Sequence, residues 1–233
     1  MNNAGLGRLT PCPPLAQDWA RQGGTTNLFR DLVTSEETLR AIIGGDPSEV
    51  ARKKELPALD PHARAFIARS PFLLLGTSGP DGRCDVSPKG DAPGFVRVLD
   101  DQHLVIPDRP GNKRLDGMRN IVKNPHVGII FLLPGNDFTL RVNGRAVITR
   151  DPELMQTLAA QGKVPILGIG VEVEEVFLHC ARSFRRGRLW DQASWPGPDA
   201  VASMPCMLYD QTKGAMSLEA LEARNAQSLV TLY

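Results

Sequence analysis

The sequence predicts a mainly β protein with helical additions, arranged around an antiparallel barrel. Three observations support this fold class. At least six strand-like segments lie between residues 72 and 177, most of them joined by tight turns, and helical patterns gather toward the two ends. Parallel strands need a crossover connection, usually a helix, between them, and this alternation is missing here. A doubly wound fold is therefore disfavoured, and the turn-rich pattern favours closure of the strands into a barrel.

Helices and loops are expected before the strands begin. Residues 1–24 are rich in Pro, Gly and Thr, which indicates an irregular arm. Thr34 fits the first position of a capping box, with Glu37 three residues later, and the helix would stop at Gly44. Asp60 then caps a second helix. We expect residues 1–59 to form an N-terminal arm and helix that precedes the main domain.

The strand region begins after Ser70 with an apolar run and the turn Gly79-Pro80-Asp81-Gly82. Residues 127–133 are continuously apolar, which indicates a strand buried on both faces, whereas residues 138–148 alternate. The expected strands cover residues 72–77, 83–87, 95–99, 103–106, 127–133, 138–148 and 171–177. Together they supply enough strands for a small barrel.

Three further helices are expected around these strands. Residues 115–122 have helical spacing and end at Asn124-Pro125, and Asp151-Pro152 begins a helix that runs up to Gly162. After Trp195 the chain is rich in Pro and Gly, and Ser217 then caps a final helix. Residues 192–233 should therefore form a C-terminal linker and helix that pack on the barrel or on a dimer partner.

Composition and charge exclude several classes of function. The chain has 233 residues, with 27 basic and 26 acidic side chains and a formal net charge of +1, so it has no general field for nucleic acid or anionic membranes. The four cysteines form no CxxC pair, and the four histidines lack metal-ligand spacing, so we expect no metal site. We expect a soluble, cytoplasmic protein whose thiols are free.

Two polar segments are candidates for a ligand site. Ser87 to Asp91 ends one strand, and Arg109 to Arg114 directly precedes a helix. A helix start attracts phosphate through its unpaired N–H groups, and Lys113 and Arg114 add full positive charges there. Asn112 is placed to cap the helix, and Lys89 to approach from the strand end. The residues thus suggest a phosphomonoester clamp; the alternative is a pair of solvated basic turns neutralised by nearby aspartates.

A longer set of motifs, in order, covers residues 60–191. Its most specific parts read SPFLLLGTSGPDGRCDVSPKGDAPGFVRVLDD, LVIPDRPGNKRLDGMRNI, TLRVNGRA and FLHCARSFRRGRLWD. This region resembles the pyridoxamine 5′-phosphate oxidase-like, FMN-binding split-barrel superfamily, and within it a bacterial branch of probable FMN-dependent enzymes with unassigned substrate. The resemblance implies that residues 60–191 form an FMN-binding split β-barrel domain of six or more antiparallel strands.

The resemblance also implies a cofactor site shared by two chains. FMN would lie at a homodimer interface, with its phosphate held by Lys and Arg side chains and with a C-terminal segment of the partner covering the flavin. Trp190 would stack near the ring; an ordinary role as an apolar anchor is the alternative. Carried over position by position, the cofactor-binding residues would be Val86, Ser87, Pro88, Lys89, Gly90, Ile106, Pro107, Asp108, Asn112, Lys113, Arg114, Arg188 and Trp190.

Two departures from the family pattern bear on the reaction. True pyridoxamine phosphate oxidases carry Arg where Asp85 stands, and an Arg-x-His where this chain reads Arg188-Leu189-Trp190. The resemblance therefore implies a flavoprotein oxidoreductase, with hydride transfer between FMN and a small organic substrate or nicotinamide, rather than vitamin B6 oxidation. No catalytic residue is carried over. The alternatives are a non-enzymatic flavin carrier or sensor, or a barrel that uses deazaflavin or haem.

Overall fold

A computed structural model describes residues 30–233. The described chain divides into two compact units. One unit holds residues 49–195 together with Leu232 and Tyr233, and the other holds residues 30–48 and 196–231. The first unit carries the whole β-sheet.

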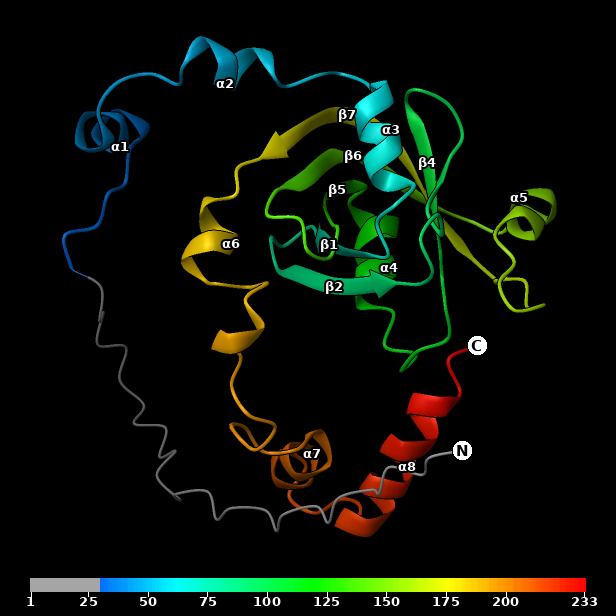
Figure 1. Cartoon of the computed structure of the whole chain (residues 1–233). Coiled ribbons are helices and arrows are strands. Elements are labelled where there is room, and N and C mark those ends of the chain that lie inside the picture. Colours follow the sequence, from blue (N-terminus) through cyan, green and yellow to red (C-terminus); the bar gives the residue numbers. More distant parts are fainter. Residues whose placement is uncertain (1–29) are drawn as a thin grey trace. The chain divides into compact units, whose positions relative to one another are not determined.

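One antiparallel sheet of seven strands forms the centre of the first unit (Figure 1). Its strand order is β2-β1-β5-β6-β7-β4-β3. The strands are β1 Phe72–Ser78, β2 Cys84–Gly90, β3 Arg97–Val98, β4 His103–Pro107, β5 His126–Leu132, β6 Thr139–Thr149 and β7 Gly168–His179. The antiparallel, mainly β architecture predicted from the sequence is confirmed.

The expected closure of the barrel is wrong, because the strands at the two ends of this order, β2 and β3, do not pair with each other. A strand was expected over residues 95–99, but β3 keeps only Arg97–Val98. Phe95 and Val96 instead turn into the core, where they are 8% and 3% exposed. The open edge of the sheet at β2 carries Pro88 and several residues that line a pocket.

The core lies on one face of the strands. Alternate residues are buried along β1 and β5, with Leu73, Leu75, Ile129 and Phe131 at 0–1% exposure. Residues 128, 130 and 132 between them are half-buried, so β5 is not buried on both faces as its apolar run suggested. The other face of β1 and β5 is thus apolar but only partly covered by this chain.

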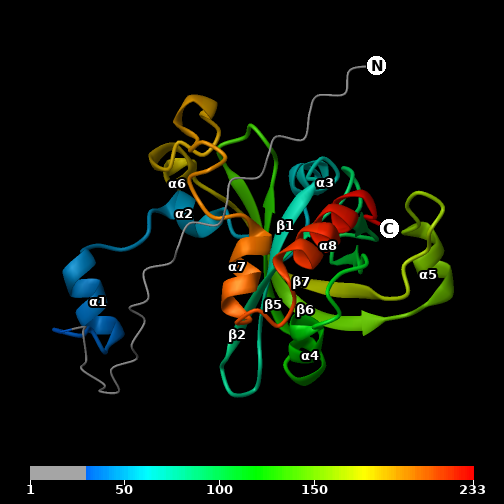
Figure 2. The same ribbon diagram turned by 90° about the horizontal axis from the view of Figure 1, so that it is seen from below.

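Two helices of this unit help to position the candidate site. Helix α4, Asp116–Lys123, packs against β1, β2 and β6 and buries Met118 and Ile121. Helix α5, Pro152–Thr157, joins β6 to β7 at the tip of their long hairpin (Figure 2). It begins at the expected cap, where Asp151 accepts a hydrogen bond from Leu154 N–H at 2.9 Å, but it ends earlier than the sequence suggested.

Further helices of this unit are short. Helix α3, Pro61–Ile67, has the expected cap at Asp60. The others were not predicted, since each spans three to five residues and shows no clear periodicity; they are α2 Glu49–Lys53, α6 Arg182–Arg186 and the 3-10 turn Gln192–Ser194.

The second unit is helical. Its elements are α1 Glu36–Ile43, α7 Met204–Gln211 and α8 Leu218–Val230. Ser35, and not Thr34, caps α1, because the Ser35 hydroxyl accepts from Thr38 N–H. Ser217 caps α8 as expected. The irregular arm predicted for residues 1–24 lies outside the described residues.

Two findings bear on the expectations drawn from composition. No helix in the described part of the chain has the length and apolar character needed to span a bilayer. Cys84 and Cys180 are free, as expected, whereas Cys206 is disulfide-bonded, so the expectation of free thiols is wrong for that residue.

Candidate functional site

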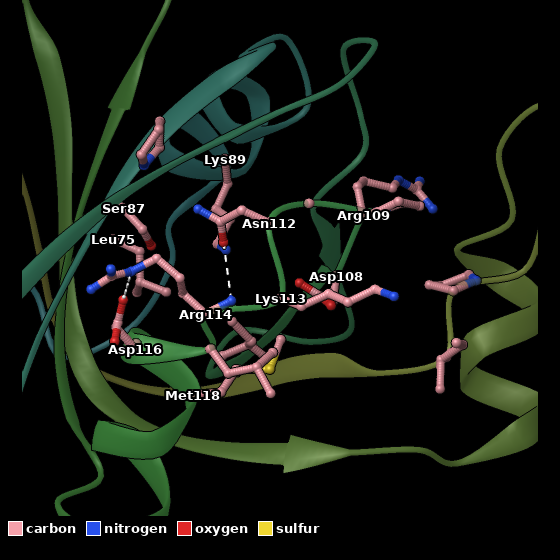
Figure 3. A pocket seen from close by; sticks show the side chains of 18 of the residues that line it. Leu75, Ser87, Lys89, Asp108, Arg109, Asn112, Lys113, Arg114, Asp116 and Met118 are labelled. Atoms are coloured by element: carbon pink, nitrogen blue, oxygen red, sulfur yellow. Dashed lines mark hydrogen bonds and ion pairs between the residues drawn. The ribbon is translucent and has the colours of Figure 1, made fainter. Parts of the chain in front are cut away.

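A cavity of about 620 Å³ opens beside β2 and the start of α4 (Figure 3). This volume falls in the range of small-molecule pockets, roughly 300–1,000 Å³. The walls come from β1, β2, the segment after β4, the start of α4, the loop before β7, and Tyr233. The lining includes Leu75, Asp85, Ser87, Lys89, Asp108, Arg109, Asn112, Lys113, Arg114, Asp116, Met118, Lys163, Val164, Pro165, Ile166 and Tyr233.

Strand β2 lines this cavity with the five consecutive residues Asp85 to Lys89, and their burial alternates. Asp85, Ser87 and Lys89 are half-buried, whereas the residues between them are exposed, as expected for a strand with one covered face. The start of α4 lies close to this face, because a Cβ built on Gly117 would be 3.4 Å from Asp85 Oδ2 and 3.8 Å from Ser87 Oγ. A side chain at position 117 would thus be in van der Waals contact with β2, which places the start of α4 against this face of the strand.

The turn before α4 differs from the expected one. Asn112 does not cap the helix; its side-chain oxygen instead accepts from Arg114 N–H at 3.1 Å, within the turn. Leu115 occupies the N-cap position with a φ of 61°, and it makes no side-chain capping bond. Lys113 has the same φ. Non-glycine residues in this left-handed region are uncommon and gather at ligand-binding sites. The first turn of α4 thus keeps donors without a side-chain cap at the pocket wall.

The Arg114 guanidinium in this turn forms a solvent-exposed ion pair. Arg114 Nε lies 2.7 Å from Asp116 Oδ2, and the two side chains are 72% and 36% exposed. Figure 3 shows this pair on one side of the view and Arg109 on the other, with Asp108 between them. An exposed ion pair of this kind contributes little to stability, so an incoming anion can replace the Asp116 carboxylate at small cost.

Asp108 carries a carboxyl group in the middle of the pocket wall. Its backbone N–H donates to Leu167 O at 3.0 Å, which fixes the segment after β4 against the loop before β7. Burial raises the pKa of Asp108 above its ordinary value, and the nearby Lys89 ammonium only partly opposes this effect. The carboxyl group therefore holds a proton more readily than an exposed aspartate does.

The other end of the pocket is built around a buried ion pair. Arg109 Nε lies 2.6 Å from Asp91 Oδ2, with side chains 17% and 3% exposed. The Tyr233 hydroxyl donates to the second carboxylate oxygen of Asp91, and the Arg109 guanidinium lies over the Tyr233 ring, 5.7 Å from its centroid. Lys163 Nζ donates to the carbonyl oxygen of Tyr233.

The pKa of Asp91 reflects this network. Burial by itself raises the pKa of Asp91, but hydrogen bonds from Tyr233, from Ala92 N–H and from Arg109 outweigh it. The pKa of Asp91 therefore lies below its ordinary value, and the carboxylate stays charged beside Arg109. The Tyr233 hydroxyl in turn has a raised pKa because of its bond to Asp91, so it remains a donor at neutral pH.

Comparison with known protein families identifies the family of this chain. Residues 59–180 match the model of the pyridoxamine 5′-phosphate oxidase family, which is more than half of the chain. The chain belongs to the pyridoxamine 5′-phosphate oxidase family. This match confirms the resemblance seen in the motifs, and the open antiparallel sheet is the split barrel expected of such proteins.

Solved structures show distant likenesses to this pyridoxamine 5′-phosphate oxidase family member. HupZ of Group A Streptococcus is 20% identical over 52% of this chain and 93% of its own, with a TM-score of 0.42. A putative pyridoxamine 5′-phosphate oxidase of Lactobacillus delbrueckii is 23% identical over 53% of this chain and 98% of its own, also at 0.42. HutZ, the heme storage protein of Vibrio cholerae, is 19% identical over 52% and 93%, at 0.37. No curated protein matches the chain.

The structure brings together most of the family positions predicted from the sequence. Val86, Ser87, Pro88, Lys89, Asp108, Asn112, Lys113 and Arg114 all line the cavity. Ile106 is instead fully buried in the core, Pro107 pairs with Gly168 inside the sheet, and Gly90 lies at the strand end outside the lining.

Arg188 and Trp190 also lie away from the cavity of their own chain. Arg188 pairs with Asp191, at 2.5 Å between Nη2 and Oδ2. Trp190 donates to Asn136 O at 2.8 Å and lies against Phe184. Neither residue therefore contacts the cavity of its own chain.

Sequence analysis missed two parts of the pocket wall of this family member. The loop from Lys163 to Ile166 is one; its Val164 and Ile166 side chains are 40% and 86% exposed. Apolar residues next to a lysine in a Pro-containing loop are a pattern that could have indicated contact with a ligand. Tyr233 is the other, and it had no local signal, since it reaches Asp91 across 142 residues of chain.

Proposed function

We propose that this cavity binds FMN and that the protein is an FMN-dependent oxidoreductase, which transfers a hydride between FMN and a small organic substrate or nicotinamide. One observation carries the proposal. Lys113, Arg114 and the uncapped start of α4 all line a cavity of about 620 Å³, inside a domain of the pyridoxamine 5′-phosphate oxidase family. A helix start beside two cations is a suitable site for a phosphomonoester.

The lining residues form two groups, which would bind different chemical parts of the ligand. The phosphate would lie against Lys113, Arg114 and the first N–H groups of α4, and Lys89 adds a further charge from β2. Leu75, Met118 and the loop at Val164 offer apolar surface for a ring system. Bound FMN supplies the hydride chemistry, and the protein supplies orientation, polarity and exclusion of water.

We propose that the substrate is not pyridoxamine 5′-phosphate, the molecule that names the family. Asp85 stands where the family enzymes carry Arg, and its carboxylate faces the start of α4. The segment Arg188-Leu189-Trp190 lacks the family histidine. A phosphate-bearing vitamin B6 substrate would therefore lose two of its recognition groups.

A homodimer is part of this proposal. The outer face of β1 and β5 is apolar and half-exposed, and Phe72 and Val86 nearby are 36% and 64% exposed. Arg188 and Trp190 lie outside the cavity of their own chain, as expected if they cover the flavin of a partner. Light scattering at micromolar concentration should give the mass of two chains; a monomer that still binds FMN tightly would contradict a shared site.

The test of the cofactor is the visible absorption spectrum of the freshly purified protein, repeated on the ligand released by heat. We expect flavin bands and a released molecule with the mass of FMN. A colourless protein that also fails to take up added FMN would overturn the proposal. An iron-dependent Soret band would assign haem, and a released deazaflavin would assign that cofactor.

Turnover is tested separately from binding. FMN-loaded protein is mixed without oxygen with NADH, NADPH and small amines, and bleaching of the flavin band is followed. Reduction by one donor class supports an oxidoreductase. FMN that binds reversibly but is reduced by none of them would indicate a flavin carrier or sensor in place of an enzyme.

A further inference from the structure

We propose that Tyr233 forms the wall on which the planar ring of the bound ligand lies, and that Asp91, Arg109 and Lys163 position it. The inference deepens the proposed function and rests on it, because it assigns the ring-binding end of the same cavity. Tyr233 belongs to the compact unit that holds the sheet and lines its pocket.

Contacts on three sides fix the Tyr233 side chain and backbone. The hydroxyl donates to Asp91, whose side chain is 3% exposed. The aromatic ring packs against the Arg109 guanidinium, and the backbone carbonyl accepts from Lys163. Asp91 follows β2, Arg109 follows β4 and Lys163 precedes β7, so three separate parts of the sheet hold one residue. A ring held in this way loses little entropy when a ligand packs against it.

Charge differs between the two ends of the cavity. At the Tyr233 end, Asp91 already neutralises Arg109 through a short, buried pair, and the Lys163 ammonium is held by the carbonyl oxygen of Tyr233. At the α4 end, the exposed Arg114 and the uncapped first turn of the helix remain available to an anion. A ligand with an anionic group at one end and an uncharged planar ring at the other matches this distribution.

Apolar surface next to Tyr233 supports the same assignment. Val164 and Ile166 line the cavity beside Lys163 but are 40% and 86% exposed, which leaves apolar side chains in water at the pocket mouth. A planar aromatic ring that packs between this loop and Tyr233 would cover them. Offset stacking on a tyrosine adds to the area that is buried.

The inference predicts a spectroscopic signature that a purely structural role would not give. A phenol in contact with an oxidised isoalloxazine quenches its fluorescence by electron transfer, whereas a benzene ring does not. Tyr233→Phe keeps the ring and removes the hydroxyl, so bound FMN should become clearly more fluorescent. Tyr209→Phe is the matched control, because Tyr209 belongs to the helical unit and does not line the cavity.

Titration with two ligands distinguishes binding of the ring from binding of the phosphate. Full-length wild type, Tyr233→Ala and Lys113→Ala/Arg114→Ala are titrated with FMN and with lumiflavin, which has the ring but no phosphate. Tyr233→Ala should weaken both ligands by about tenfold, since stacked aromatic contacts are of this order. The double variant should weaken FMN but leave lumiflavin binding unchanged.

The outcomes distinguish this inference from the proposed function. If wild type binds neither flavin, both are overturned. If wild type binds FMN, but Tyr233→Ala binds both ligands with wild-type affinity and Tyr233→Phe leaves the fluorescence unchanged, the assignment of Tyr233 alone is overturned. Loss of FMN affinity without loss of lumiflavin affinity in Tyr233→Ala would likewise contradict a ring-binding wall.

Discussion

The pocket contains two arginine–aspartate pairs with nearly equal geometry and very different surroundings. Arg109 and Asp91 approach to 2.6 Å with side chains 17% and 3% exposed, whereas Arg114 and Asp116 approach to 2.7 Å with side chains 72% and 36% exposed. Distance alone therefore does not distinguish them. The first pair is shielded and joined to Tyr233, and the second is in contact with water.

Because the two ion pairs differ in solvent exposure, they are suited to different roles. Removing one partner of a buried pair leaves an uncompensated charge away from water, which is costly. An exposed pair is screened by solvent and is exchanged easily for another partner. The Arg109–Asp91 pair is thus suited to hold a wall in place, and the Arg114–Asp116 pair to release a cation toward a ligand. The following predictions test this comparison.

The largest effect is expected from removing the cations at the exposed end. Lys113→Ala with Arg114→Ala should weaken FMN about a hundredfold or more, because each charge-assisted contact to the phosphate is strong. The free energy of unfolding should change little. Isothermal titration calorimetry measures the affinity, and Arg52→Ala with Lys53→Ala on α2 is a matched control that removes two adjacent exposed cations far from the lining. Unchanged FMN affinity would remove the phosphate assignment.

The buried pair should dominate stability. Asp91→Ala leaves Arg109 enclosed without its carboxylate, so the free energy of unfolding should fall by about 3–5 kcal/mol. Asp116→Ala, at the exposed pair, should cost no more than about 1 kcal/mol. Urea unfolding of both variants provides the comparison, and equal losses would show that burial does not separate the two pairs.

The two carboxyl groups Asp91 and Asp108 should respond to pH in opposite directions. Asp91 has a lowered pKa in the folded protein, so its stabilisation is present above the ordinary aspartate pKa and is lost as pH falls through the folded value. Asp108 has a raised pKa, so its contribution is present at low pH and is lost as pH rises through the folded value.

Asp108→Asn isolates the second of these effects. The variant should be more stable than wild type at neutral pH, because the carboxylate no longer has to be buried, and this advantage should vanish below about pH 4, the ordinary pKa of aspartate. Thermal unfolding between acid and neutral pH measures it. A variant that is less stable than wild type at pH 7 would show that attraction to Lys89 outweighs burial.

The smallest effect is expected at the exposed carboxylate. Asp116→Asn frees Arg114 from its competing partner, so FMN affinity should rise, but by no more than about fivefold. The gain should shrink in high salt, where exposed charges are screened. Weaker FMN binding in this variant would indicate that Asp116 orients Arg114 rather than competing with the phosphate.

Local sequence signals were sufficient for the exposed end of the pocket. Basic residues directly before a helix predict an anion site without any knowledge of the fold, and Lys113 and Arg114 do line the cavity. The details of the turn were not predictable, because Asn112 bonds to Arg114 N–H inside the turn and leaves Leu115 at the helix start. The left-handed conformations of Lys113 and Leu115 have no signature in a sequence without glycine at those positions.

The buried end could not have been found in the same way. Asp91, Arg109, Lys163 and Tyr233 come from four separate segments, and only the sheet topology brings them together. The strand periods gave the antiparallel fold and its core face, because alternation reports burial directly. They did not predict whether the barrel closes, since closure requires pairing between the two end strands of the sheet, β2 and the two-residue β3.

The position of Pro88 on the edge strand β2 has a consequence for assembly. Proline has no backbone N–H, so the free edge of β2 lacks a donor near its middle, and a strand from another molecule cannot pair along it without a gap. Two copies are therefore discouraged from joining their edges into one continuous sheet. If the protein is a dimer, we expect its subunits to meet through the faces of their sheets, which also protects the folded chain against open-ended, fibre-like association.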